Sequence, residues 1–322
     1  MKSTDNQLSI EKFIIENEWG QTPASLYEPI RYIMSLGGKR LRPMLTMMSY
    51  SLFKSDVERI IPYAAAVEVF HNFTLMHDDI MDNAPMRRGQ KTVHEKWNTS
   101  TAILSGDAML VKVYELFSSL EAKQLKELLP LFNTCATEVC EGQQWDMEFE
   151  EKKNVTTAQY LEMIRLKTAV LLGFSLELGG LLAGIKPKAK LALRNLGVNI
   201  GIGFQLNDDL LDVYGDKSKT GKQIGGDIIS NKKTFLLIQA LERAKGKDKA
   251  ELQKWLNAKT FDNVKKVKAV TAIYDTLKIQ SLVEAEINNY FTKGLSGLSV
   301  LPSSENRDAM GTFILALMKR QK

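Results

Sequence analysis

The sequence predicts an all-α protein, and two observations lead to that prediction. Apolar residues recur at helical spacing along most of the 322 residues, and no segment alternates apolar and polar residues as a half-buried strand would. The eight prolines lie mostly where helices would begin or end, as at Pro43, Pro130, Pro187 and Pro302. The composition does not shift along the chain, so we expect one domain over residues 1–322.

Four segments show the helical pattern most clearly. Near the N-terminus, Ile10, Phe13 and Ile14 share one face of a helix. Three long, mostly buried helices follow, and the first of them is expected to bend near Pro62. These helices are expected over residues 57–82, 156–185 and 187–216.

Composition and charge narrow the class of protein. An apolar content of 44% with 25% charged residues is typical of a globular protein with a sizeable core. The net charge is +5 and the basic residues are spread along the chain, which disfavours nucleic-acid binding and is compatible with small anionic substrates. Cys135 and Cys140 have no partners at metal-ligand spacing, and the N-terminus lacks an export signal, so we expect a reducing, cytoplasmic location.

The most apolar stretch is residues 168–185, which is about long enough to cross a bilayer. Glu177 lies near its middle, glycines are scattered through it, and the chain has no second stretch of this kind. We therefore expect a central helix that is buried on all sides, and no transmembrane segment.

Two copies of the pattern Asp-Asp-x-x-Asp follow long apolar helices, once as HDDIMD and once as NDDLLD. In a helix, the first and last aspartates of each copy share a face, while the middle one lies about a quarter turn away. Crowded carboxylates repel one another and are costly to desolvate, and a hard divalent cation relieves that cost. The six candidate metal ligands are Asp78, Asp79, Asp82, Asp208, Asp209 and Asp212.

The chemistry of these clusters favours magnesium together with a diphosphate. Magnesium takes oxygen ligands and is often bound by a few carboxylates, waters and substrate phosphates. A solvated acidic helix end is the alternative for one such motif, but two copies with the same spacing argue against it. Arg87 and Arg88 follow the first cluster directly, and guanidinium groups bind phosphate oxygens in bidentate fashion. The motif GGKRLRP adds Lys39 and Arg42 in a glycine turn before Pro43, which suits the first turn of a helix.

These motifs together resemble the trans-type isoprenyl diphosphate synthases, the polyprenyl synthetase family. The matching segments occur in the family's order and cover roughly residues 37–235: GGKRLRP, HDDIMD with MRRG, TVH, SGDAML, LKTA, GFQLNDDLLD, GDKSKTGK, GGDI and NKKT. The resemblance implies a helical bundle around a central cavity, the isoprenoid synthase fold, usually as a homodimer. It implies condensation of isopentenyl diphosphate, head to tail, with an allylic diphosphate (dimethylallyl, geranyl or farnesyl), and three Mg²⁺ ions that bridge the allylic diphosphate to both aspartate clusters.

The resemblance also assigns roles to individual residues. The ligands that it implies for the allylic diphosphate are Arg87, Lys167, Lys222 and Lys232. The pocket that it implies for isopentenyl diphosphate consists of Lys39, Arg42, His71 and Arg88. Thr168 and Gln205 would lie beside the reacting carbons.

Product length is expected to depend on Phe73, five residues before Asp78, with the small Thr74 beside it. In the family, a bulky aromatic residue at this position acts as a floor for the growing chain. The pattern resembles short-chain synthases, so we expect a twenty-carbon product, with a fifteen-carbon product as the alternative. Phe73 as plain core, with the depth set from another helix, also remains open.

Two other functions compete with this interpretation. A class I terpene cyclase would share the bundle and the first cluster, but it usually replaces the second cluster and lacks GGKRLRP. A non-catalytic subunit of a heteromeric synthase often loses a cluster, and this chain has both.

Overall fold

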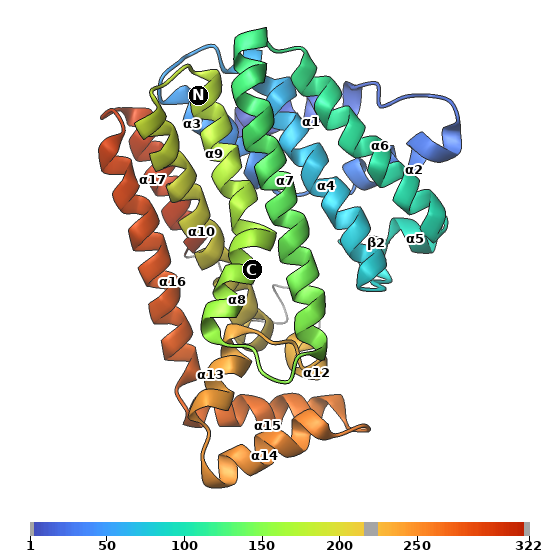
Figure 1. The fold of residues 1–322 in the computed structure, drawn as a ribbon, viewed down its shortest axis with the longest axis vertical. Helices are drawn as coiled ribbons and strands as arrows, with labels where there is room; N and C mark the ends of the chain where they lie inside the picture. Colours follow the sequence, from blue (N-terminus) through green and yellow to red (C-terminus); the bar gives the residue numbers. More distant parts are fainter. Residues whose placement is uncertain (1–2, 216–224, 319–322) are drawn as a thin grey trace. The chain divides into compact units, whose positions relative to one another are not determined.

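The structure is a computed structural model of the chain, and it describes residues 3–215 and 225–318 (Figure 1). Almost all of the secondary structure in these ranges is helical. The only strands among the described residues are β1 (Met86–Arg87) and β2 (Gln90–Lys91), which pair antiparallel with Arg87 opposite Gln90. The prediction of an all-α protein is confirmed.

Contacts between residues group the chain into two compact units. Unit 1 comprises Met1–Asn133 and Phe174–Leu193, and unit 2 comprises Thr134–Gly173 and Arg194–Lys322. The expectation of a single domain over the whole chain stays a prediction. Three helices contribute residues to both units: α7 (Ala122–Glu151), α9 (Val170–Leu182) and α10 (Pro187–Tyr214).

Unit 1 is organised around one helix. Its other elements are α1 (Ser3–Glu16), α2 (Ala24–Ser35), α3 (Leu41–Ser51), η1 (Val57–Ile60), α4 (Ile61–Met81), α5 (Val93–Lys96) and α6 (Thr99–Ser118). The central one is α4, which contacts α1, α2, α3, α5 and α6 and lies side by side with α6 in Figure 1. Every residue from Ala64 to Phe70 is buried, so the middle of α4 is covered on all sides, in line with the mostly buried helix that the sequence predicts.

The predicted bend near Pro62 is wrong. The chain forms the short 3₁₀ turn η1 first, and α4 then begins at Ile61 with Pro62 in its first turn. A proline is tolerated there because its missing N–H would have no partner inside the helix. Pro43 lies within the first turn of α3, as predicted.

Aromatic rings fill the core of unit 1. The ring of Phe132 lies 5.2 Å from those of Phe70 and Phe117, 5.3 Å from that of Tyr114 and 5.7 Å from that of Phe174, measured between centroids. Most of these pairs are edge-to-face, the arrangement that the ring quadrupole favours. The middle of α4 therefore lies against an apolar, aromatic interior.

Unit 2 is also helical. Its remaining elements are α8 (Thr157–Ile164), η2 (Arg165–Ala169), α12 (Gly226–Ile229), α13 (Phe235–Arg243), α14 (Gly246–Asn257), α15 (Asn263–Thr276), α16 (Ile279–Ser296), η3 (Gly297–Val300) and α17 (Glu305–Met318). The neighbouring helices α14 and α15 pack against each other, and α15 also contacts α12 (Figure 1).

The predicted helix over residues 156–185 is interrupted by a wider turn. The segment η2 is π-helical, between α8 and α9. Two glycines allow the backbone of η2 to approach the neighbouring helices α7 and α10. A Cβ on Gly142 of α7 would lie 2.2 Å from the backbone nitrogen of Lys167, and one on Gly201 of α10 would lie 2.5 Å from Cα of Ala169. Single π turns inside α-helices occur frequently at functional sites.

Most of the apolar stretch of residues 168–185 lies in α9. Each residue of α9 is buried, including Glu177, which is 7% exposed. Across the described ranges, no helix combines the length and the apolar character that crossing a membrane requires. The prediction that this stretch forms a buried helix is confirmed.

Candidate active site

The first aspartate cluster lies at the C-terminal end of α4, where Asp82 is the capping residue. The middle aspartate, Asp79, is only 2% exposed and accepts two hydrogen bonds of 2.7 Å from Nε and Nη2 of Arg87 on β1. This bidentate geometry fixes the β1–β2 hairpin against the helix end. Arg87, which the resemblance assigns to the allylic diphosphate, is thus engaged with Asp79 here.

The second cluster occupies the last two turns of α10. Its middle aspartate, Asp209, is 6% exposed and accepts hydrogen bonds from the hydroxyl of Tyr160 and from Nε2 of Gln205, the latter at 2.9 Å. Burial and the nearby carboxylate of Asp227 raise the pKa of Asp209 above its ordinary value. Asp212 accepts a 2.9 Å hydrogen bond from the backbone N–H of Asp227, which ties α12 to the cluster.

Both clusters stand at the negative end of a helix dipole. A carboxylate there is disfavoured by about 0.3–1 kcal/mol, because the last carbonyl groups already carry partial negative charge. A fold that only needed polar helix ends would gain by placing lysine or arginine at these positions. The repeated placement of three aspartates therefore indicates a site for a cation.

The outer aspartates are more accessible than the middle ones. Asp82 is exposed, and Asp78, Asp208 and Asp212 are half-buried. Within residues 3–215 and 225–318, no three histidine, cysteine, aspartate or glutamate side chains lie close enough together to hold a metal ion. Magnesium commonly uses one or two carboxylates and fills its other positions with water and substrate phosphate, so solvent-facing aspartates on successive turns fit it.

A second group of charges in unit 1 surrounds His71, which is half-buried on α4. Burial of the ring and the positive charges of Arg42, Arg88, Arg87 and Arg40 hold its pKa well below 6.5. The imidazole is therefore neutral at physiological pH. The structure thus gathers most of the residues that the resemblance assigns to isopentenyl diphosphate around one position.

The glycine turn of GGKRLRP contacts Arg88. A guanidinium nitrogen of Arg88 donates to the carbonyl oxygen of Gly37, and a Cβ on Gly38 would lie 3.1 Å from the same group. Gly38 has a φ of 145°, where a side chain would also be strained. Lys39 is exposed beside this turn and Arg42 is half-buried in the first turn of α3.

Arg40 is a residue of this motif that sequence reasoning missed. Its side chain is fully buried and makes charged hydrogen bonds to Glu11 and Glu68. The motif alone gave no reason to separate this arginine from Lys39 and Arg42, because all three lie in one four-residue basic run. Only its contacts with the carboxylates of Glu11 and Glu68, which are distant in the sequence, distinguish Arg40 from the other two basic residues.

In unit 2, Asp146 of α7 joins two candidate diphosphate ligands. Its Oδ2 lies 2.6 Å from Nζ of Lys167 and 3.8 Å from Nζ of Lys232. Burial alone would raise the pKa of Asp146, but the ammonium groups of Lys232 and Lys167 hold it below the ordinary value. Sequence reasoning missed Asp146, since its partners lie 21 and 86 residues further along the chain, and no spacing rule covers such distances.

Thr168 and Gln205, expected beside the reacting carbons, are neighbours in unit 2. The hydroxyl of Thr168 lies 3.2 Å from Oε1 of Gln205, and Gln205 donates in turn to Asp209. The π turn η2 supplies Lys167 and Thr168 in succession. The expected ligand Lys222 lies outside the described residues.

Phe73 lies on α4 between two other rings of the same helix. Its centroid is 4.8 Å from that of His77 and 5.6 Å from that of Phe70. His77 in turn packs on Gly106 of α6, where a Cβ would come within 2.2 Å of the imidazole. The Thr74 hydroxyl donates to the carbonyl oxygen of His71, which keeps it within its own helix. Phe73 is thus held in one position by packing.

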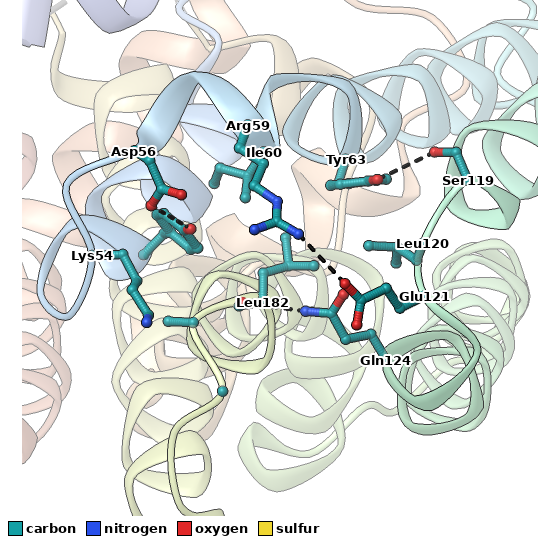
Figure 2. A pocket seen from close by; sticks show the side chains of 13 residues that line it. Lys54, Asp56, Arg59, Ile60, Tyr63, Ser119, Leu120, Glu121, Gln124 and Leu182 are labelled. Atoms are coloured by element: carbon teal, nitrogen blue, oxygen red, sulfur yellow. Dashed lines mark hydrogen bonds and ion pairs between the residues drawn. The ribbon is translucent and has the colours of Figure 1, made fainter.

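A separate cavity of about 290 Å³ lies near the start of α4 (Figure 2). Tyr63 lines it and is 15 residues before Asp78, roughly 22 Å along the helix. Arg59 and Glu121 of this cavity point toward each other in Figure 2, and a guanidinium nitrogen of Arg59 lies 3.6 Å from Oε1 of Glu121. None of the predicted site residues lines this cavity, so it is distinct from the aspartate clusters.

Each of two helices, α4 and α10, ends in an aspartate motif with a basic side chain near its middle aspartate: Arg87 near Asp79 and Lys232 near Asp209. The profile of the polyprenyl synthetase family matches residues 23–274. A geranylgeranyl pyrophosphate synthase from Geoglobus acetivorans is 44% identical over 236 residues, 72% of each chain. A geranylfarnesyl diphosphate synthase from Natronomonas pharaonis is 35% identical over 318 residues, 93% of this chain and 91% of the relative.

The solved structures agree with the sequence relatives. A crystal structure of a geranylgeranyl pyrophosphate synthase matches with a TM-score of 0.93 and 39% identity, and covers 99% of this chain and 98% of that one. The chain belongs to the polyprenyl synthetase family and is a prenyltransferase. The isoprenoid synthase fold that the resemblance implied is confirmed.

Proposed function

We propose that the protein condenses isopentenyl diphosphate, head to tail, with an allylic diphosphate to give a short-chain trans-prenyl diphosphate. The observation that carries this proposal is the repeated aspartate motif at two helix C-termini, each with its middle carboxylate buried and its outer carboxylates nearer to solvent. The match to the polyprenyl synthetase family favours this reaction over a terpene cyclase.

We propose that Asp78, Asp82, Asp208 and Asp212 supply the carboxylates for magnesium, with Asp79 and Asp209 supporting them from within. Three ions per site is the number that the resemblance implies. When bound, magnesium stabilises the negative charge that develops on the departing diphosphate.

The cationic side chains fall into two groups with different proposed roles. Arg87, Lys167 and Lys232, together with Lys222, would hold the diphosphate of the allylic substrate. Lys39, Arg42, Arg88 and the neutral His71 would hold isopentenyl diphosphate, whose phosphate oxygens suit guanidinium forks. The proposal is supported by the shared counter-ion of Lys167 and Lys232 and by the arginines around His71.

The reaction needs no dedicated side-chain base. The carbon–oxygen bond to the allylic diphosphate breaks and leaves an allylic cation, and the double bond of isopentenyl diphosphate attacks it to form the new carbon–carbon bond. The proton then lost from the adduct passes to the released diphosphate. Thr168 and Gln205 would orient the reacting carbons, and the apolar interior of each unit would exclude water from the cation.

We propose a twenty-carbon product, with fifteen carbons as the alternative. The position of Phe73, fixed by His77 and Phe70, supports a floor on α4. The two relatives named above form products of different length, so their similarity does not choose among chain lengths.

We further propose a homodimer in which a second copy covers α6. Leu104 and Val111 are 60% and 64% exposed and lie one above the other, seven residues apart. Ile103 and Tyr114 extend the same apolar surface. Light scattering after gel filtration should show a dimer that L104E/V111E dissociates, while V264E, at the 77% exposed Val264 of α15, should leave it intact.

The cytoplasmic location stays a prediction.

The test of function is a product assay. Purified protein would receive magnesium, isopentenyl diphosphate and dimethylallyl, geranyl or farnesyl diphosphate in turn, and the products would be identified by mass. D78N/D82N should abolish elongation, whereas D308N, at the 73% exposed Asp308 of α17, should not. If the unaltered protein elongates none of the three starters at any magnesium level, the chain is a non-catalytic subunit and the proposal is wrong.

A further inference from the structure

Arg40 is the one arginine of GGKRLRP that does not face solvent. Its Nε and Nη2 donate to the two carboxylate oxygens of Glu11, at 2.8 and 3.1 Å. Its Nη1 donates to Glu68 at 2.9 Å, and Nη2 also donates to the carbonyl oxygen of Met34 at 2.8 Å. A guanidinium with this many partners is not available to bind a phosphate.

The backbone explains why such an anchor is needed. Arg40 has a φ of 47°, in the left-handed region, and it caps the N-terminus of α3. A residue with a Cβ stays in this conformation only where its surroundings hold it. Lys39 and Arg42 lie on either side, so the conformation of Arg40 sets the directions in which their side chains leave the chain.

The two carboxylates that hold Arg40 come from different helices. Glu11 lies on α1 and is 29% exposed, whereas Glu68 lies in the buried middle of α4 and is 3% exposed. Nδ2 of Asn72 also donates to the oxygen of Glu68 that Arg40 uses, at 3.3 Å. The N-terminal helix α1, which carries no recognisable motif, thereby reaches the glycine turn.

We propose that Glu11 and Glu68 are positioning residues for isopentenyl diphosphate: acting through Arg40, they hold the turn that presents Lys39 and Arg42 to its diphosphate. This inference rests on the proposed function and assigns a role to α1 within it. The carboxylates touch no substrate and take no part in bond making.

A positioning role and a purely electrostatic role of Glu11 predict opposite changes in the binding of isopentenyl diphosphate when Glu11 is replaced. Glu11 and Glu68 both lie close enough to Arg88 to interact electrostatically with its guanidinium. The negative charge of Glu11 therefore weakens the attraction of this region for an anion. If charge alone mattered, Glu11→Gln would therefore tighten the binding of isopentenyl diphosphate. If Glu11 positions the turn, the same substitution weakens the binding.

The experiment compares Glu11→Gln with Glu16→Gln on the same helix. Glu16 is 65% exposed and its nearest basic partner, Lys12, is 4.0 Å away, so this control changes the charge of α1 without touching Arg40. We expect Glu11→Gln to raise KM for isopentenyl diphosphate about tenfold, equivalent to about 1.4 kcal/mol. KM for the allylic diphosphate and kcat at saturation should stay within about twofold, and Glu11→Asp should recover part of the loss.

Several results would overturn the inference. A KM for isopentenyl diphosphate that is unchanged or lower in Glu11→Gln would leave only the charge effect. An equal rise of both KM values would indicate general loosening of unit 1. If Glu11→Gln does not fold, as judged by circular dichroism, Glu11→Asp carries the same comparison against Glu16→Gln.

The inference and the proposed function can fail separately. If the unaltered protein forms no product, titration calorimetry with isopentenyl diphosphate alone still measures the Kd of its pocket for this substrate. A tenfold weaker Kd in Glu11→Gln would then support the positioning role without catalysis. No heat of binding to the unaltered protein would overturn both claims.

Discussion

Replacing Arg87 by methionine would leave the buried carboxylate of Asp79 without both of its 2.7 Å hydrogen bonds from that side chain. Removing one partner of a buried ion pair costs about 3–5 kcal/mol of unfolding free energy. Arg87 is 25% exposed and partly screened by water, so we take the lower end and expect a loss of about 3 kcal/mol. Asp79→Asn alone, which keeps an acceptor oxygen, should cost about 2 kcal/mol.

The double variant should lose less than the two single changes together. Once Asn replaces Asp79, the loss of the guanidinium no longer leaves a buried charge unpaired. We therefore expect D79N/R87M to lose about 3 kcal/mol of unfolding free energy, which gives a coupling energy of about 2 kcal/mol between the two residues. Urea unfolding followed by circular dichroism measures these values, without magnesium or diphosphate, so that substrate binding does not contribute.

The exposed pair of Arg59 and Glu121 is a matched control. Its nitrogen and oxygen are 3.6 Å apart, and its side chains are 65% and 74% exposed. The same double-mutant cycle there should give a coupling below about 0.5 kcal/mol. A coupling at Asp79 and Arg87 no larger than this control value would refute the reasoning that the pair fixes the end of α4.

Three further predictions concern product length, the allylic diphosphate and pH. Phe73→Ala removes six ring carbons, about the size of one five-carbon unit, and should lengthen the main product by one unit in mass analysis; an unchanged product would place the floor elsewhere. Asp146→Asn should lower kcat/KM for the allylic diphosphate about tenfold, because Lys167 and Lys232 lose their shared counter-ion, with KM for isopentenyl diphosphate unchanged; a lower allylic KM would contradict this. Burial and the nearby arginines hold the pKa of His71 below 6.5, so only the unfolded chain takes up that proton as pH falls. From pH 7.5 to 5.5 the unaltered protein should therefore lose about 1.4 kcal/mol more unfolding free energy than H71Q, and equal losses would exclude the effect.

Features that depend on local periodicity could be predicted from the sequence. The all-α class, the buried middle of α4 and the buried α9 follow from runs of apolar residues, which need no knowledge of distant parts of the chain. The positions of the aspartate motifs at the ends of α4 and α10 follow in the same way, because each motif comes directly after such a run.

Features that depend on distant partners could not be predicted. The burial of Arg40 needs Glu11 and Glu68, which lie 29 and 28 residues away on opposite sides of it. The π turn η2 depends on missing side chains at Gly142 and Gly201, and a glycine inside a helical pattern does not say what approaches it. The resemblance to a family supplied roles for Lys167 and Gln205, but gave no reason to expect Asp146 beside Lys167 and Lys232 or Tyr160 beside Asp209.

The two aspartate motifs have the same spacing, but their middle carboxylates are held by different partners. In the first motif, Asp79 is paired with the full charge of Arg87, eight residues further along. In the second, Asp209 meets the neutral hydroxyl of Tyr160, whose pKa burial raises well above 10, and an amide from Gln205. In each case the partner ties the helix end to another element of its own unit: β1 in the first motif and α8 in the second.

A buried middle aspartate that anchors the helix, next to two outer aspartates that lie nearer to solvent, would explain why each motif has three aspartates. A metal that uses one or two carboxylates from a helix needs only the outer pair, which share a face. Those carboxylates repel each other at the negative end of the helix dipole, so a free helix end would fray to separate them. The buried middle aspartate prevents this separation by fastening the last turn to its neighbour. In the proposed site, the outer pair would therefore stay near the bulk solvent before a cation arrives, which would reduce the ordering cost of binding.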